Sequence, residues 1–168
     1  MMISAKMAAS LNQQIANELN ASHNYLAMSY CFEHMGLKVF AQRFAGQADE
    51  ERGHALRIAR FIQDVGGKVT FVGVAQPRAS YPTAKAIVKA AVDSELTVTK
   101  QINGLMAQAE KERDYATRSF LKWFVDEQVE EVSSMTELLQ LVTTAGEENL
   151  FHVEARLMQA MSVPKSEV

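Results

Sequence analysis

The chain has 168 residues, of which 48% are hydrophobic and 22% are charged, and these values are typical of a globular domain. Its net charge of −3 gives no electrostatic basis for binding nucleic acid, and no apolar run reaches the ~18 residues that a membrane span needs. A single cysteine excludes an intrachain disulfide framework and a four-cysteine metal site. We therefore expect one cytoplasmic domain over residues 1–168, with neither nucleic acid nor a membrane as its partner.

Long helices are predicted because only three prolines and eight glycines interrupt the chain. Four long helical segments and a short fifth one are expected, at approximately residues 4–34, 38–66, 83–111, 114–144 and 148–161. Thr83 and Asp114 are suited to cap the helices that follow them. Residues 162–168 are predicted to form a polar tail.

The lengths of the connections predict how the helices are arranged. The first two helices and the last two long helices are joined by only a few residues, which favours antiparallel hairpins. The connection over residues 67–82 is much longer, and at ~3.3 Å per residue it can span ~50 Å. A helix of about 28 residues is only ~42 Å long. This crossover can therefore run the whole length of the bundle and make the second and third helices parallel. Its apolar residues near Val69 to Val74 could form a short strand.

Each long helix has an apolar stripe with heptad spacing, and a glutamate interrupts each stripe near its middle. Counted from the hairpin turns, the four glutamates lie within about one helical turn of the same height. One such residue would typically set register or oligomeric state. Four buried carboxylates cost several kcal/mol each unless something neutralises them, and these stripes contain no Lys or Arg. A pair of divalent cations would neutralise these carboxylates. The residues concerned are Glu18, Glu51, Glu95 and Glu131.

A histidine three residues after one of these glutamates adds a nitrogen ligand, because Glu51 and His54 share a helix face. Helix-bundle diiron sites combine single glutamates with such Glu-x-x-His pairs. Glu18, Glu51 and His54 would bind one metal, and Glu51 would bridge to a second metal bound by Glu95 and Glu131. Gln128 lies where a fully symmetric site would have another ligand, and we expect it to be a hydrogen-bonding neighbour. Iron or manganese suits this donor set best.

Taken together, these motifs resemble those of the non-haem ferritins, particularly the bacterial ones, over essentially the whole chain. The resemblance implies an all-α, ferritin-like four-helix bundle with a long crossover between the second and third helices and a short fifth helix. It also implies a ferroxidase that converts Fe(II) to Fe(III) with O2 or H2O2 and stores ferric mineral inside a 24-subunit cage. The segments that carry it are Asn17–Leu19, Tyr25, Glu50–His54, Glu95 and Trp123–Glu131.

The resemblance assigns roles to further residues. Tyr25 and Trp123 match an aromatic pair that supplies electrons in similar proteins, although core packing explains Trp123 equally well. Tyr25 lies one heptad from Glu18, so a hydrogen bond from it to a ligand is expected. Arg52 follows the bridging glutamate, where bacterioferritins have the methionine that binds haem, so no haem is expected. A third iron site would use Glu50, Glu127 and Glu130.

Three alternatives share the helical pattern. Rubrerythrin-like oxidases or peroxidases usually add a cysteine-rich iron domain, which Cys31 alone cannot form. DNA-protecting miniferritins place their ligands between subunits and often have basic tails. A bundle without metal is the non-enzymatic alternative. Cys31 itself is predicted to be a small buried residue, and His23, His34 and His152 are expected at the surface or at the edge of the core.

Overall fold

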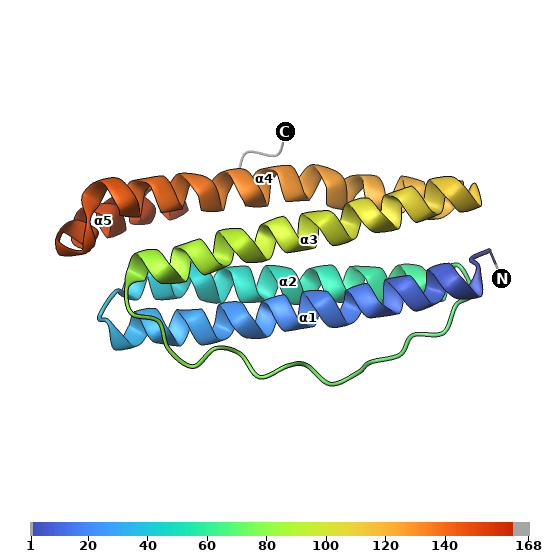
Figure 1. Ribbon diagram of the computed structural model, residues 1–168, viewed down its shortest axis with the longest axis horizontal. Coiled ribbons are helices and arrows are strands. Elements are labelled where there is room, and N and C mark those ends of the chain that lie inside the picture. Colours follow the sequence, from blue (N-terminus) through green and yellow to red (C-terminus); the bar gives the residue numbers. More distant parts are fainter. Residues whose placement is uncertain (1, 163–168) are drawn as a thin grey trace.

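A computed structural model describes residues 2–162, and over this range the chain is helical with no strands. The four long helices α1 (Ala5–His34), α2 (Lys38–Asp64), α3 (Ala84–Glu112) and α4 (Tyr115–Ala145) lie side by side along the long axis (Figure 1). A 3-10 turn, η1 (Glu147–Asn149), leads into α5 (Leu150–Ser162). The predicted all-α four-helix bundle with a short fifth helix is therefore confirmed. Met1 and most of the predicted polar tail, residues 163–168, lie outside the described residues.

Local side chains fix where the long helices begin. As predicted, Thr83 caps α3, and its Oγ1 accepts a hydrogen bond of 3.1 Å from the N–H of Ala86. Asp114 caps α4 in the same way, with its Oδ1 2.9 Å from the N–H of Thr117. The helix α2 ends before Gly66, whose φ of 82° lies in the left-handed region that glycine adopts without strain.

Within residues 2–162, no helix is both long and apolar enough to cross a membrane.

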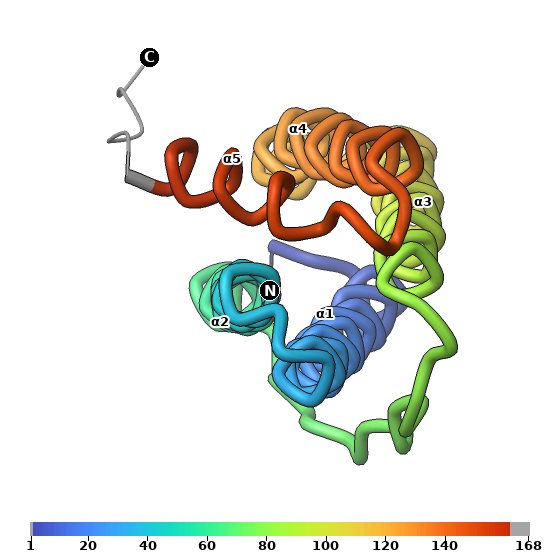
Figure 2. The backbone as a smooth tube through the Cα atoms, turned by 90° about the vertical axis from the view of Figure 1, so that its left-hand side faces the viewer, coloured from blue at the N-terminus to red at the C-terminus, as the bar shows by residue number. Residues whose placement is uncertain are grey.

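The short helix α5 runs across the bundle and contacts both α4 and α2 (Figure 2). The start of α2 has no side-chain cap of its own, and α5 supplies one. Glu154 Oε1 accepts a 2.7 Å hydrogen bond from the N–H of Val39. A carboxylate at a helix N-terminus also interacts favourably with the helix dipole, so this contact helps to hold α5 against the bundle.

The crossover runs outside the bundle from the end of α2 to the start of α3 (Figure 1). Two asparagines on α1 hold its backbone. Asn12 donates a 2.9 Å hydrogen bond to the carbonyl of Lys68 and accepts a 2.7 Å bond from the N–H of Thr70. Asn20 accepts a 2.7 Å bond from the N–H of Ala75. The short strand suggested for this segment was wrong, because side chains of α1, and no neighbouring strand, meet these backbone groups.

A buried polar layer divides the hydrophobic core into two clusters. One cluster surrounds Phe32, Phe40 and Phe44 at the end of the bundle that carries the α1–α2 turn. The other surrounds Leu11 and Ile58 and fills the opposite half. On every long helix the break between the two clusters contains a buried acid. The helical periodicity that builds the core therefore also brings four carboxylates to one level.

Candidate metal centre

The four glutamates that interrupt the apolar stripes are all buried in one layer. Glu18, Glu51 and Glu95 are at most 1% exposed, and Glu131 is 7% exposed. His54 joins them at 6% exposure. Among residues 2–162, no Lys or Arg side chain forms an ion pair with any of these carboxylates. His54 is the one basic side chain among the described residues that pairs with them, so most of their charge is left for protons or a metal ion to neutralise.

Three of these side chains converge closely. One ligand atom from each of Glu18, Glu51 and His54 lies within 4.8 Å of the others. His54 Nδ1 is 3.8 Å from Glu18 Oε2 and 3.4 Å from Glu51 Oε2. Glu18 Oε2 and both oxygens of Glu51 accept no hydrogen bond from the described residues. Buried polar atoms rarely remain without a partner. Carboxylate oxygens and an imidazole that point at one another fit a divalent metal ion.

The carboxylates on α3 and α4 are held by neighbouring donors. The Tyr25 hydroxyl donates a hydrogen bond to Glu95 Oε1, and Gln128 Nε2 lies 3.3 Å from Glu95 Oε2. Gln47 Nε2 donates a 2.7 Å hydrogen bond to Glu131 Oε2. Gln128 thus acts as a hydrogen-bonding neighbour in this structure. The expected contact between Tyr25 and a carboxylate of the site is present, on Glu95.

Glutamine amides distinguish three of the carboxylates from the fourth. Gln14, only 2% exposed, donates a 2.8 Å hydrogen bond to Glu18 Oε1, just as Gln47 and Gln128 bind the acids on α4 and α3. Glu51 alone accepts no amide, and both of its oxygens remain available. A carboxylate can bridge two metals with one oxygen on each only when both oxygens are available. Sequence analysis missed Gln14, although its position four residues before Glu18 places both on one helix face.

Burial and mutual repulsion shift the pKa values of the layer. Burial raises the pKa of Glu51 well above the usual 4.5, and burial also raises that of Glu95. Burial together with repulsion from Glu95 and Glu50 raises the pKa of Glu131 to about 7. Burial alone would lower the pKa of His54, but the adjacent Glu18 and Glu51 outweigh it and raise the value to about 10. Without metal, the layer therefore holds protons at neutral pH.

An acidic cavity of about 400 Å³ adjoins this layer between α2 and α4. The three residues of the expected third iron site, Glu50, Glu127 and Glu130, line it together with Glu131. Glu127 is half-buried, and Glu50 and Glu130 are exposed. Ala160 and Met161 of α5 also line it. The cavity therefore brings the buried Glu131 together with exposed acids, and Arg43 also lines it.

Two aromatic side chains border the layer. Tyr25 is 1% exposed, and burial together with the nearby Glu95 raises its pKa well above 10, so its hydroxyl stays protonated. Trp123 packs edge-on against His54, with ring centroids 5.4 Å apart. The Arg57 guanidinium carbon lies 3.9 Å from the centre of the Trp123 ring, within cation–π range.

Comparisons with known proteins identify the family to which this chain belongs. The model of the family described as Ferritin-like domain matches residues 8–145. Ferritin BfrB of Mycolicibacterium smegmatis is 36% identical over 95% of this chain and 88% of its own length. The bacterial non-heme ferritin of Staphylococcus aureus is 34% identical over 88% of this chain and 89% of its own length.

Solved structures show the same fold. An open pore ferritin from the hyperthermophilic archaeon Archaeoglobus fulgidus superposes with a TM-score of 0.91 at 34% identity, and the match covers 93% of this chain and 96% of that one. The bundle, the crossover, the fifth helix and the buried acids thus all occur in a chain that belongs to the ferritin family.

Proposed function

We propose that this protein oxidises Fe(II) at the buried glutamate layer and stores the Fe(III) product as a mineral inside a cage, in the cytoplasm. One observation carries the proposal: Glu18, Glu51 and His54 converge in the core, and three of their carboxylate oxygens have no hydrogen bond. Membership of the ferritin family supports iron storage as the purpose of such a site.

The proposed centre takes two Fe(II) ions as substrate. Glu18 and His54 bind one ion, Glu95 and Glu131 bind the other, and Glu51 bridges them through its two free oxygens. The two ions would lie ~3.5–4 Å apart, the spacing of two-metal sites. Each ion gives one electron, so that O2 and two protons form H2O2, or H2O2 and two protons form two waters. Two chemically different ligand sets suit a site that releases its product.

The acidic cavity offers a route for iron to move between the buried layer and the space outside the bundle. Glu50, Glu127 and Glu130 would bind a third ion there, one step away from Glu131. Twenty-four chains of 18.7 kDa would form a shell of roughly 450 kDa, and its interior would hold the mineral. α5 would lie near the four-fold axes of that shell.

The direct test is anaerobic addition of Fe(II) followed by exposure to air, with size-exclusion light scattering on the same sample. We expect fast oxidation of about two irons per chain and iron that co-elutes with a shell of roughly 450 kDa. Oxidation no faster than in buffer would overturn the ferroxidase proposal. A small species that oxidises iron but retains none would overturn the storage proposal and favour a rubrerythrin-like oxidase.

Metal binding is expected to weaken strongly as pH falls. Because the pKa of His54 is about 10, its imidazole must release a proton before it can bind metal at neutral pH. Because the pKa of Glu131 is about 7, its carboxyl group must release a second proton below pH 7. Affinity for Co(II) should therefore fall about 10²- to 10³-fold between pH 8 and pH 6. Calorimetry in buffers of different ionisation enthalpy would measure the protons released. Equal affinity at both pH values would contradict this ligand set.

Tyr25→Phe is expected to slow oxidation about 2- to 10-fold and to leave the two-iron stoichiometry intact. The variant loses one buried hydrogen bond to Glu95, worth about 0.5–1.5 kcal/mol. If Tyr25 and one Fe(II) together supply the two electrons that reduce H2O2 to two waters, with the hydroxyl proton of Tyr25 passing to Glu95, freeze-quench EPR will show a tyrosyl radical in wild type only. Tyr115→Phe, at an exposed position, is the matched control. An unchanged rate and an unchanged radical signal would remove Tyr25 from the site.

A further inference from the structure

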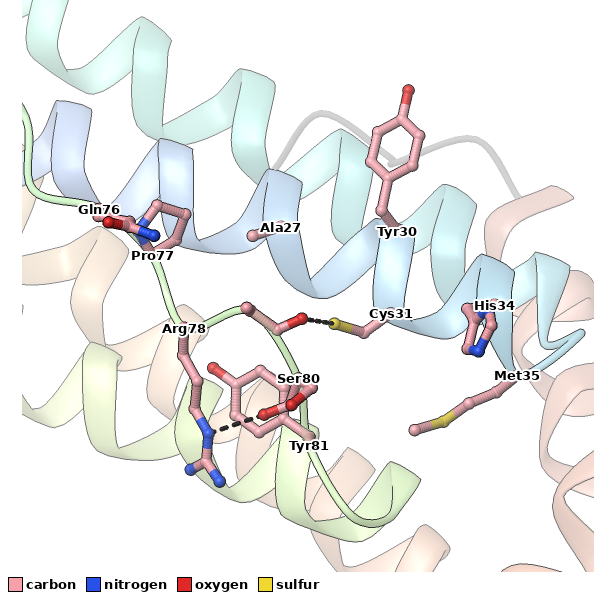
Figure 3. A pocket seen from close by; sticks show the side chains of 11 residues that line it. Ala27, Tyr30, Cys31, His34, Met35, Gln76, Pro77, Arg78, Ser80 and Tyr81 are labelled. Atoms are coloured by element: carbon pink, nitrogen blue, oxygen red, sulfur yellow. Dashed lines mark hydrogen bonds between the residues drawn. The ribbon is translucent and has the colours of Figure 1, made fainter.

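Cys31 and Gln14 are two polar side chains that lie outside the proposed ligand set. Cys31 was predicted to be buried, but it is half-buried and lines a cavity of about 430 Å³ between α1 and residues 76–81 of the crossover (Figure 3). The prediction was wrong because the crossover, rather than a helix, lies over this face of α1. The thiol is 3.8 Å from the carbonyl oxygen of Ala79, so it packs the crossover against the helix. Gln14, in contrast, lies in the core and contacts a proposed iron ligand.

The Gln14 amide connects that ligand, Glu18, to α3. The Gln14 side chain is only 2% exposed. Its Nε2 donates a 2.8 Å hydrogen bond to Glu18 Oε1, and Gln101 Oε1 on α3 accepts a second, longer bond of 3.3 Å. An amide nitrogen carries two hydrogens, so both bonds can form at once. Gln14 therefore fixes the Glu18 carboxylate relative to α3 as well as to α1.

A third contact fixes the orientation of this amide. Asn17 Nδ2 donates a 3.0 Å hydrogen bond to Gln14 Oε1. Turning the amide over would place its oxygen against the oxygens of Glu18 and Gln101, and its hydrogens against those of Asn17. Buried polar groups that lose their partners are costly, so Gln14 presents its N–H groups, and not its oxygen, to Glu18.

The two oxygens of Glu18 are therefore not equivalent. Oε1 accepts the amide, whereas Oε2 accepts no hydrogen bond from the described residues and lies 3.8 Å from His54 Nδ1. The last torsion of a glutamate side chain has a broad distribution, so a carboxylate without such a donor could turn. With Oε1 held, Oε2 is the oxygen that faces His54. Gln47 holds Glu131 in a similar way, through its Oε2.

We propose that Gln14 is a positioning residue of the iron centre, which holds Glu18 so that Oε2 alone binds the ion shared with His54. This ion occupies the first position, and the ion beside Glu95 and Glu131 occupies the second. The inference rests on the proposed function, because Glu18 is a ligand only if the layer binds metal. Holding a ligand in its bound geometry lowers the entropy lost when the ion binds. Gln14 thus raises the affinity of the first position and leaves that of the second unchanged.

Gln14→Leu removes the amide and keeps a side chain of similar size. Calorimetry with Co(II) and the assembled protein measures the affinities, and diffraction at the cobalt absorption edge shows which position is empty. The first position should bind Co(II) about 10- to 100-fold more weakly, as is usual for indirect partners of metal ligands, and the second should be unchanged. Fe(II) oxidation should slow at limiting iron but return to within about threefold of wild type at saturating iron, since all ligands remain.

Three further variants accompany this one. Gln47→Leu should weaken the second position instead of the first, because Gln47 holds Glu131. Gln63→Leu, at an exposed position on α2, should leave both affinities unchanged. Asn17→Ala alters a half-buried residue and so disturbs the core less. It should weaken the first position about 2- to 10-fold through the loss of one hydrogen bond to Gln14.

The outcomes separate this inference from the proposed function. Wild-type affinity at the first position in both Gln14→Leu and Asn17→Ala would overturn this inference alone. Equal weakening of both positions by Gln14→Leu would overturn it too, because a general packing defect would then explain the loss. A wild-type protein that binds no Co(II) in the buried layer would overturn the proposed function together with this inference.

Discussion

Replacing Glu51 by alanine is expected to reduce Fe(II) oxidation to the rate seen in buffer alone. Glu51 is the one carboxylate of the layer with two free oxygens, so its removal takes a ligand from both proposed iron positions. Stopped-flow absorbance after mixing Fe(II)-loaded protein with O2 measures the effect. His54→Ala should lose the first iron position and should also lose rapid oxidation.

The matched control is Glu137→Ala, an exposed acid on α4 that lies outside the glutamate layer. This variant should retain the wild-type rate and the stoichiometry of two irons per chain. Circular dichroism and size-exclusion chromatography must show that all three variants fold and assemble as wild type does. Rapid two-iron oxidation by a folded Glu51→Ala protein would exclude a bridged centre at this position.

The metal-free protein is expected to become more stable when Glu51 is replaced by leucine. The side chain is 1% exposed, accepts no hydrogen bond and lies near other carboxylates, so wild type bears a desolvation cost without metal. Glu18 lies 3.8 Å from His54 and remains its carboxylate partner in this variant, so removing the unsatisfied Glu51 carboxylate should raise stability by about 1–3 kcal/mol. Scanning calorimetry in the presence of a chelator would detect this as an increase in Tm.

Added Co(II) should make wild type more stable than the Glu51→Leu protein. Wild type binds the ion in its folded state and gains stability by mass action, whereas Glu51→Leu gains little. Glu137→Leu, at an exposed position, should change stability by no more than about 0.5 kcal/mol in either condition. A Glu51→Leu protein that is less stable than wild type without metal would mean that this carboxylate has a structural role, as the metal-free alternative requires.

Much of the fold follows from periodicity and capping. The heptad stripes predicted four long helices, and Thr83 and Asp114 were recognised as caps because their side chains suit that role. The parallel arrangement of α2 and α3 followed from the length of the crossover. The structure of the crossover itself could not be predicted, because Asn12 and Asn20, far away in the sequence, determine where its backbone groups find partners.

The glutamate layer was predictable for the same reason, since each acid lies on a core stripe at a similar height. The hydrogen-bond donors that orient these acids were not predicted. Gln14 shares a helix face with Glu18 and could have been noticed, but the bond from Gln47 to Glu131 joins α2 to α4 and depends on how the helices pack. The exposure of Cys31 was also missed, because the pattern of one helix does not show where a neighbouring loop leaves a cavity.

Diffraction at the iron absorption edge, from crystals soaked anaerobically in Fe(II), tests the central claim most directly. We expect two anomalous peaks per chain in the buried layer, one beside Glu18 and His54 and one beside Glu95 and Glu131, with Glu51 between them. Peaks confined to the surface acids, or a layer that stays free of iron while crystals remain intact, would contradict the assignment of this site as a two-iron ferroxidase centre.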